Sequence, residues 1–290
     1  MRLSVLGAGR VGRTLARLWR EAGRFEIADV VATTDHHARD AVAFIGGGRP
    51  VGRLDGLQPA DLYMLTVPDD RIAALAASLS AAGPLPVGAT VFHCSGALDS
   101  SLLAPLADRG MHCASLHPMH SFADPAVSLT AFAGSCCALE GDEAACALIA
   151  PAAVAIGARL IRLDASAKPL YHAAGVVASN YLTGLIDGAT ELLAAAGVPG
   201  EMHATILEPL VRGSVDNLFE QGAEAALTGP ISRGDAGVVA RQMDRITRQA
   251  PQLAPLYREM GRVTLRLAER GGRLTPEAAR AVARALDAEA

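Results

Sequence analysis

Residues 3–13 decide the fold that we expect, and they read Leu3-Ser4-Val5-Leu6-Gly7-Ala8-Gly9-Arg10-Val11-Gly12-Arg13. A strand-like apolar run leads into three glycines with the spacing G-x-G-x-x-G, and the residues that follow have helical spacing of apolar side chains. In a strand-turn-helix unit the first glycine permits the tight turn and the second lets a diphosphate approach the backbone. The third lets the helix pack closely on the strand.

The glycine turn predicts a dinucleotide site at the start of the chain. We expect the phosphates to lie at the N-terminal end of the first helix, where backbone N–H groups are unpaired. The residues assigned to this contact are Gly7, Ala8, Gly9, Arg10, Val11 and Gly12. The alternative is a turn with a structural role only, because a chain with 29 glycines contains such spacings by chance.

Size, composition and charge narrow the class of protein. The chain has 290 residues, of which 51% are hydrophobic and only 4% aromatic. Such a composition is typical of a helix-rich α/β protein packed with small side chains. The formal net charge of −4 does not favour contact with a nucleic-acid backbone, so we expect no nucleic-acid partner.

Cysteine usage and hydropathy indicate a reducing compartment. The five cysteines are odd in number and lack C-x-x-C spacing, which favours buried, reduced thiols. We expect no secretory signal, because the first residues already form a strand and a glycine turn. The longest apolar run, residues 144–158, contains Pro151 and Gly157 and is too short to span a bilayer. These features predict a soluble cytoplasmic protein with no membrane partner.

The first half of the chain alternates strand and helix signals. Strands are expected at residues 25–31, 61–67, 89–93, 111–116, 134–139 and 158–163. This rhythm predicts a parallel, doubly wound sheet with helices on both faces. Ligands of such sheets lie beyond the carboxyl ends of the strands. We expect that edge to carry the glycine turn together with Thr33, Val67, Pro68, Ser95, Gly96 and His117.

The end of the second strand bears on the choice between NAD and NADP. An acidic residue there binds the ribose 2′-hydroxyl of NAD. This chain has no carboxylate at the strand tip, and Asp35 comes a few residues late. Thr33, Thr34 and His36 are suited to surround a phosphate, which favours NADP over NAD. The alternative is a solvated loop.

The second half of the chain shows only helical signals. A helical pattern runs from residue 164 to 196, which corresponds to roughly 45 Å. Further helices are expected at residues 201–220, 236–248, 250–269 and from 276 onward. We therefore predict a Rossmann domain over residues 1–163 and an all-helical domain over residues 164–290.

The start of the long helix carries the candidate catalytic residues. At 100° per residue, Lys168, His172 and Ser179 fall within roughly 40° of one another, and Asn180 follows directly. Reduction of a carbonyl or imine needs a proton donor beside the hydride donor, and lysine and histidine are suited to that role. The alternatives are that Lys168 caps the edge of the sheet and that His172 is a core residue.

Other candidate ligands are weaker. Cys113, His117 and His120 suit zinc by type, but no fourth ligand is evident, so we predict no metal. We expect His117 to contact the substrate. Arg233, in a loop between helices, either brings a guanidinium to an anionic substrate or simply belongs to a turn.

Five motifs together resemble a known family. They begin at Gly7, His93 (HCSG), Leu116 (LHPMHSFAD), Tyr171 (YHAA, then SNYL from Ser179) and Gly229 (GP, then RGD from Arg233). Over nearly the whole chain they are similar to the Rossmann-like/DUF2520 family of the 6-phosphogluconate dehydrogenase-like superfamily.

The resemblance implies a Rossmann domain and a helical domain that commonly builds a dimer, with the active cleft between them. Members are often labelled NADP- or F420-dependent oxidoreductases. In related β-hydroxyacid dehydrogenases a lysine and an asparagine one turn later act on the substrate. Lys168 matches that lysine, but His172 stands in place of the asparagine.

The combined expectation is a cytoplasmic, homodimeric NAD(P)-dependent oxidoreductase that acts on a small polar carbonyl, imine or hydroxy substrate. NADP is the expected cofactor, with NAD and F420 as alternatives. The alternative function is a non-catalytic sensor or regulatory dimer that binds NADP without turnover.

Overall fold

The computed structural model describes residues 1–82 and 85–288 of the chain. The chain forms two compact units, Met1–Ser179 and Asn180–Ala290, which we describe separately. This division lies C-terminal to the domain boundary predicted after residue 163, which stays a prediction.

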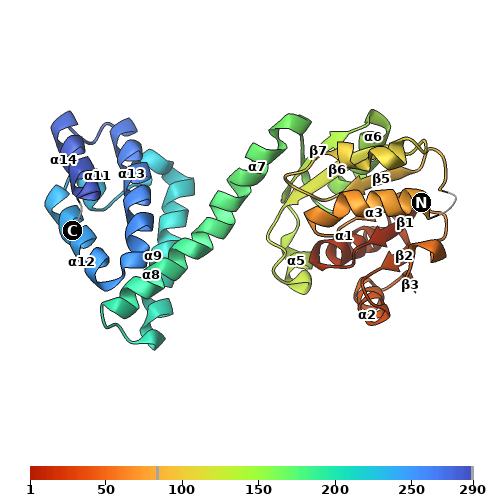
Figure 1. The fold of residues 1–290 in the computed structure, drawn as a ribbon, viewed down its shortest axis with the longest axis horizontal. Helices are drawn as coiled ribbons and strands as arrows, with labels where there is room; N and C mark the ends of the chain where they lie inside the picture. Colours follow the sequence, from red (N-terminus) through yellow and green to blue (C-terminus); the bar gives the residue numbers. More distant parts are fainter. Residues whose placement is uncertain (83–84, 289–290) are drawn as a thin grey trace. The chain divides into compact units, whose positions relative to one another are not determined.

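The first unit is built on an eight-stranded sheet with the order β3-β2-β1-β4-β5-β6-β7-β8 (Figure 1). Its strands are β1 (Arg2–Leu6), β2 (Glu26–Val31), β3 (Arg49–Val51), β4 (Leu62–Leu65), β5 (Thr90–His93), β6 (His112–Met119), β7 (Cys136–Gly141) and β8 (Arg159–Arg162). The strands from β3 to β6 are parallel, as the alternating pattern predicts.

The sheet is not parallel throughout, which corrects the prediction. β7 pairs antiparallel with β6, with Ala114 opposite Gly141 and Met119 opposite Cys136, and β8 runs parallel to β7. The short connection after β6 contains only the seven-residue helix α5 (Pro125–Ala131) and brings the chain back from the same edge. A parallel pairing needs a crossover to the opposite edge, so this connection favours the antiparallel one.

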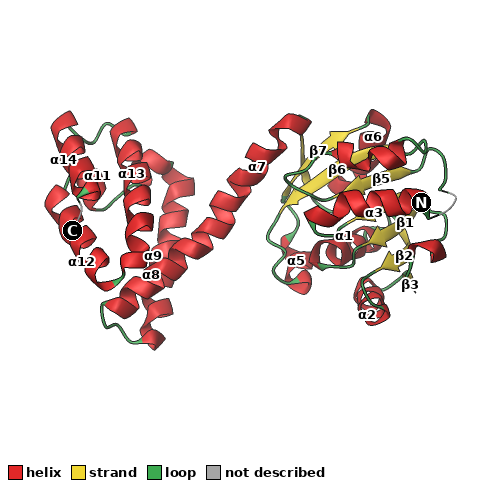
Figure 2. Cartoon of the chain, viewed as in Figure 1, coloured by secondary structure: helices red, strands yellow, loops and turns green. Residues whose placement is uncertain are grey.

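Helices cover both faces of the sheet (Figure 2). Neighbouring residues of a strand join different cores because successive side chains point to opposite faces: Met64 packs in one core and Leu65 in the other. The first core includes residues of α1 (Arg10–Glu21), α2 (Asp35–Ile45) and α6 (Glu143–Ala155). The second includes residues of α3 (Asp69–Ala81) and α4 (Ala104–Ala107).

The sequence patterns do not predict two elements near residue 40. β3 is three residues long and contains Pro50, which an edge strand tolerates because its N–H side needs no ladder partner. α2 begins at the N-cap Thr34, whose hydroxyl accepts a hydrogen bond from His37 N, and ends at Gly46 in the left-handed conformation. The segment after β2 is therefore a capped helix and not a solvated loop.

The long helix is less regular than the pattern predicts. It comprises a 3-10 turn (Ala165–Ala167), α7 (Lys168–Gly175), a π turn (Val176–Asn180) and α8 (Tyr181–Ala195). A π turn closes on i→i+5 hydrogen bonds, so the rotation of 100° per residue does not hold from Val176 to Ser179. The predicted single face of Lys168, His172 and Ser179 is therefore not preserved.

The second unit contains no strand among its described residues (Figure 1). After α8 come α9 (Gly200–Gln221), α10 (Ala223–Ala226), α11 (Pro230–Arg233), α12 (Ala236–Gln249), α13 (Ala254–Arg270) and α14 (Pro276–Asp287). The helix predicted for residues 250–269 begins later, because a 3-10 turn, Pro251–Leu253, precedes α13.

The five cysteines are free thiols, as their number and spacing predict. Within the described part of the chain, every helix is too short or too polar to span a lipid bilayer.

Candidate functional site

The turn between β1 and α1 has the tight backbone that the glycine spacing predicts. Gly7 has a φ of 103°, and a Cβ there would lie 2.7 Å from the carbonyl carbon of Thr66. A Cβ at Gly12 would collide with the Gly7 carbonyl oxygen and with Thr66 Oγ1. Thr66 Oγ1 donates a hydrogen bond to that same carbonyl, so the turn is fastened to the end of β4.

Gly9 differs from the other two glycines. A Cβ at Gly9 would have no atom within 4 Å, so its backbone borders open space. Gly9 is the N-cap of α1, and no side chain caps this helix. The bare backbone and the uncapped helix end therefore leave N–H groups available to an anionic group.

A pocket of about 490 Å³ lies against this turn. Of the residues predicted to bind a cofactor, it is lined by Gly7, Ala8, Gly9, Thr33, Val67 and Pro68. The lining does not include Arg10, Val11, Gly12, Thr34, Ser95 or Gly96. The pocket thus joins the ends of β1, β2 and β4, as expected for the edge of a doubly wound sheet.

The pocket also contains polar residues that the sequence patterns do not single out. Arg13 lines it and donates twice to the carbonyl of Ala8, at 3.1 and 3.0 Å. His37 lines it beside Thr33, with 3.4 Å between His37 Nδ1 and Thr33 Oγ1. His36 does not line the pocket, and its side chain lies 3.3 Å from Asp40 and is 81% exposed, so its contact with a phosphate stays a prediction. The helix α2 orients His37 toward the pocket, and this orientation could be recognised only once α2 was known.

The loop after β5 forms a second polar cluster, built around Ser95. Ser95 N donates to His93 Nδ1, and Ser95 Oγ donates to Asp69 at 2.9 Å. His93 Nε2 lies 2.9 Å from the carbonyl oxygen of Asp99, which makes Nε2 the protonated nitrogen. Burial lowers the pKa of His93, so its ring is a neutral scaffold for the loop.

Lys168 lies inside this cluster and is only 1% exposed. Its ammonium donates to Ser115 Oγ at 2.6 Å and to the carbonyl of Ser95 at 3.0 Å. Glu140 Oε1 lies 3.8 Å from the same nitrogen. Glu140 is not among the residues predicted from the sequence, although a carboxylate within an apolar strand is a signal that a buried cation is needed.

Two histidines lie against the next residue, Gly96. A Cβ there would lie 2.7 Å from His117 Nε2 and would collide with His172 Cδ2. The rings of His117 and His172 are 5.6 Å apart, and the ring of Tyr171 is 5.6 Å from that of His117. The structure therefore brings His117, His172 and Gly96 together at the carboxyl ends of β5 and β6.

Burial and neighbouring positive groups control the charge of this cluster. Burial, then His172 and Lys168, lowers the pKa of His117 to about 4, so its ring is neutral at neutral pH. Burial raises the pKa of Tyr171 to about 12. Within the described residues, His117 Nδ1 and the Tyr171 hydroxyl are buried without a hydrogen-bond partner.

The other predicted site residues lie elsewhere. Ser179 is exposed in the π turn and Asn180 follows it as the first residue of the second unit. Arg233 ends α11 in that unit and pairs with Asp235 at 3.0 Å. This ion pair fits the alternative of a simple turn, and contact between Arg233 and an anionic substrate stays a prediction.

Among the described residues, no three His, Cys, Asp or Glu side chains are grouped to hold a metal ion. Cys113 contacts the carbonyl of Leu103, and His120 Nδ1 lies 3.0 Å from Ser135 Oγ. The three residues considered for zinc therefore have separate surroundings.

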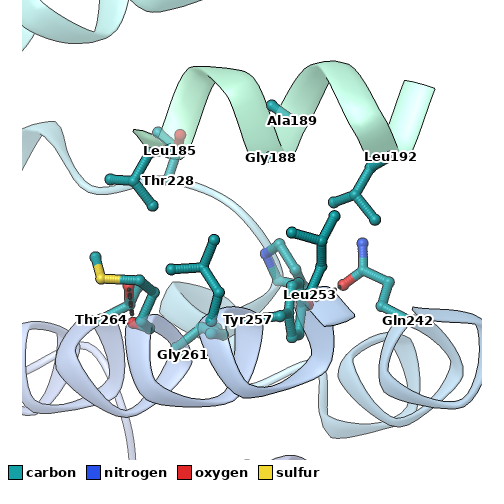
Figure 3. A pocket seen from close by; sticks show the side chains of 14 residues that line it. Leu185, Gly188, Ala189, Leu192, Thr228, Gln242, Leu253, Tyr257, Gly261 and Thr264 are labelled. Atoms are coloured by element: carbon teal, nitrogen blue, oxygen red, sulfur yellow. Dashed lines mark hydrogen bonds between the residues drawn. The ribbon is translucent and has the colours of Figure 1, made fainter. Parts of the chain in front are cut away.

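The second unit has an apolar pocket of its own, of about 370 Å³ (Figure 3). Figure 3 shows Leu185 and Leu192 of α8 on one side and Tyr257 of α13 on the other. The Tyr257 hydroxyl donates to Gln242 Oε1 at 2.6 Å, so its proton is engaged. This mainly apolar lining suits an apolar group.

Two family models match the chain. Residues 1–118 match the Rossmann-like domain, and residues 135–264 match the domain of unknown function DUF2520. No curated protein matches the chain.

Solved structures of similar fold cover almost the whole chain. Protein TM1727 from Thermotoga maritima is 26% identical, with a TM-score of 0.72 over 93% of this chain and 100% of that chain. The "putative NADP oxidoreductase BF3122 from Bacteroides fragilis" is 22% identical, with a TM-score of 0.72 over 91% of this chain and 98% of that chain. A reductive aminase from Aspergillus terreus, in complex with NADPH and ethyl levulinate, is 18% identical, with a TM-score of 0.63 over 97% and 98% of the two chains. The last two show the fold alone.

Proposed function

The chain combines a Rossmann-like domain with a DUF2520 domain, and on this premise we propose that it is an NAD(P)-dependent oxidoreductase of a small polar carbonyl, imine or hydroxy substrate. The observation that carries the proposal is the pocket at the glycine turn. Its bare Gly9 backbone and the uncapped start of α1 suit a diphosphate, and its volume of about 490 Å³ suits part of a dinucleotide. The names of the similar structures, which include NADP and NADPH, support the choice of cofactor.

Each part of this edge has a distinct task in the proposal. Gly7 and Gly9 border the diphosphate, and Gly12 lets α1 pack closely on the turn. Val67 and Pro68 line the path from the diphosphate along the end of β4. A bound nicotinamide supplies or accepts the hydride. Ser95 and Gly96 shape the floor beside the nicotinamide, and His117 orients the substrate as a neutral ring.

The 2′-phosphate of NADP has suitable partners at the end of β2. Thr33 and His37 line the pocket there, and the Thr34 hydroxyl caps α2. Arg13 lines the same pocket from α1. A hydroxyl, an imidazole and a guanidinium are groups that bind phosphate, whereas none of the described residues that line this pocket has a carboxylate to bind a free 2′-hydroxyl.

In this proposal, His172 or Lys168 donates a proton to the oxygen or nitrogen bonded to the carbon that is reduced. His172 lies over Gly96, at the end of the sheet where the substrate is placed by this proposal. Histidine is the side chain that most often serves in general acid catalysis.

We also propose that a second copy of the chain covers the helical unit. None of the described residues of α9 is buried, although the helix is 22 residues long. Its exposed apolar side chains include Leu210 at 64% and Phe219 at 84%, and a groove of about 730 Å³ lies between α8 and α9. A long helix with an open apolar face favours burial against a partner, and closed twofold dimers are the commonest such assembly.

The test compares the thermal stability of the purified protein with NAD, NADP and F420. We expect NADP to raise the unfolding temperature most, because a ligand that binds only the folded state stabilises it. The same protein is then screened against carbonyl, imine and alcohol compounds by nicotinamide absorbance, with His172→Ala as the matched variant. Stabilisation by NADP without turnover of any compound would favour the sensor alternative, and no stabilisation by any of the three cofactors would refute the dinucleotide site.

A further inference from the structure

Lys168 is the one lysine among the 26 basic residues of the chain. Every other basic residue is an arginine, so the ammonium at this position is an exception within its own sequence. It is also one of the largest fully buried side chains. A buried ammonium is unfavourable unless its protons are hydrogen-bonded and its charge is paired, so its surroundings indicate its role.

The ammonium has two hydrogen-bond acceptors and one ion-pair partner within the protein. Two hydrogen bonds go to Ser115 Oγ and to the Ser95 carbonyl, and the Glu140 carboxylate lies 3.8 Å away. These partners come from β6, from the loop after β5 and from β7. Lys168 therefore joins three neighbouring strands, and its side chain is almost fully shielded from solvent.

Glu140 is engaged in the same way. Its side chain is 7% exposed. Its two oxygens accept hydrogen bonds from Ser100 N at 2.9 Å and Ser100 Oγ at 2.8 Å. The pair is thus closed on both sides, which is the arrangement that makes a buried ion pair tolerable.

The position of the Ser95–Gly96 backbone depends on this pair. Lys168 holds the Ser95 carbonyl, and the next residue, Gly96, contacts His117 and His172 at distances that leave no room for a Cβ. A small shift of the Ser95 carbonyl therefore moves the surface on which both histidine rings rest.

The charged and titratable groups around Lys168 belong to several elements. Burial lowers the pKa of Lys168, and the nearby groups that oppose this effect are Glu140, Cys94, Asp99 and Asp69. Lys168 in turn lowers the pKa of His93 and of His117. Glu140 is the first of the opposing groups, so it contributes most to keeping the ammonium protonated.

We propose that Lys168 and Glu140 are a buried positioning pair that holds the Ser95–Gly96 turn beneath His117 and His172, and that His172 and not Lys168 transfers the proton. The proposal rests on the proposed oxidoreductase function for the reaction that the turn serves. Its test needs neither substrate nor cofactor, so the two can fail separately.

The single lysine makes a direct measurement possible. Protein grown with isotope-labelled lysine has one side-chain amine signal, which reports the protonation of Lys168 alone. In Glu140→Gln we expect the titration midpoint of this signal to fall by about one pH unit or more, because an adjacent opposite charge favours the charged form. Glu143→Gln is the matched control: this carboxylate is 88% exposed and pairs with Arg162, so the signal should not move.

The positioning role is read at the turn itself. In Lys168→Met, which keeps most of the length of the side chain without its charge, we expect amide exchange of Ser95 and Gly96 to rise by about tenfold. Ser115→Ala removes one acceptor of Lys168 and should give a smaller change at the same amides. This variant also keeps the proposal testable if Lys168→Met does not fold.

Activity gives a further distinction once a substrate is known. We expect the pH profile of turnover to keep its shape in Glu140→Gln, with a lower rate only. A profile that shifts with the lysine midpoint would assign proton transfer to Lys168 and overturn the proposal. An unchanged lysine midpoint in Glu140→Gln, or unchanged amide exchange at Ser95 and Gly96 in the folded variants, would also overturn it.

Discussion

Gly9 and Gly12 belong to the same turn, but the structure predicts opposite consequences for replacing them with alanine. A methyl group at Gly9 enters open space, whereas one at Gly12 collides with the Gly7 carbonyl and with Thr66 Oγ1. We therefore expect Gly9→Ala to weaken dinucleotide binding without unfolding the protein, and Gly12→Ala to destabilise the folded state itself.

The size of each effect follows from these surroundings. Overpacking against rigid backbone costs about 1–3 kcal/mol, and the better helix propensity of alanine returns up to about 1 kcal/mol at Gly12. For a unit of this size, a net loss of about 1–2 kcal/mol lowers the unfolding temperature by roughly 2–8 °C. Gly9→Ala changes only an N-cap, which alters the free energy of unfolding by less than about 1 kcal/mol. Loss of the close diphosphate approach at Gly9 should weaken binding at least tenfold, or about 1.4 kcal/mol.

The assay measures both quantities on both variants. Thermal unfolding without ligand is followed by circular dichroism, and NADPH binding is measured by calorimetry at a temperature where each variant is folded. If Gly9→Ala binds NADPH as the unsubstituted protein does, the diphosphate does not lie on this turn. If Gly12→Ala is as stable as the unsubstituted protein, the contact with β4 is not as close as the structure indicates.

Three further predictions concern the core, the histidine cluster and the assembly. Trp19 is fully buried and donates a hydrogen bond to the carbonyl of Ala152 at 2.8 Å. Trp19→Phe should therefore lower the free energy of unfolding by about 1–3 kcal/mol in denaturant titrations. An unchanged midpoint would contradict the packing of α1 on α6. The pKa of His117 is lowered to about 4, so below the unfolded value of about 6.5 the unfolded state binds the extra proton, and stability should fall between about pH 6.5 and 4. His117→Gln should reduce the slope of the free energy of unfolding against pH. His93 and His120 should account for the slope that remains, because burial also lowers their pKa values. An identical slope would show that His117 is not buried in its neutral form. Phe219→Glu should convert a homodimer into monomers in light scattering, with exposed Glu220→Gln as control, and a monomeric unsubstituted protein would refute the proposed assembly.

Local sequence patterns were sufficient to predict the structure where a residue's role depends on its immediate neighbours in sequence. The β1–α1 turn follows from glycine spacing, because only glycine adopts the φ of 103° seen at Gly7. The helices of the second unit follow from apolar periodicity and from stop signals such as Gly197 and Pro199. The same reasoning failed for β3, where a strand of three residues is too short for a period to show.

The candidate site required contacts between residues far apart in the chain. The sequence identified Lys168 as a candidate catalytic residue, but its partners Ser95 and Ser115 are separated from it by 73 and 53 positions. Glu140 meets it only because β7 pairs antiparallel with β6, and no local signal distinguishes that pairing from a parallel one. His37 replaced His36 in the pocket for a similar reason, since the orientation of α2 decides which histidine faces inward.

Sequence alone therefore determined the kind of fold, its glycine turn and the helical character of the second half. These are properties of short-range geometry: backbone conformations that particular residues allow, and apolar spacings that repeat every turn or every second residue. The tertiary structure alone decided the pairing of Lys168 with Glu140, the closeness of His117 and His172, and the residues that line the pocket. The reason is that a buried charge needs a partner close in space. The distance between the two groups depends on how all the strands of the sheet are paired.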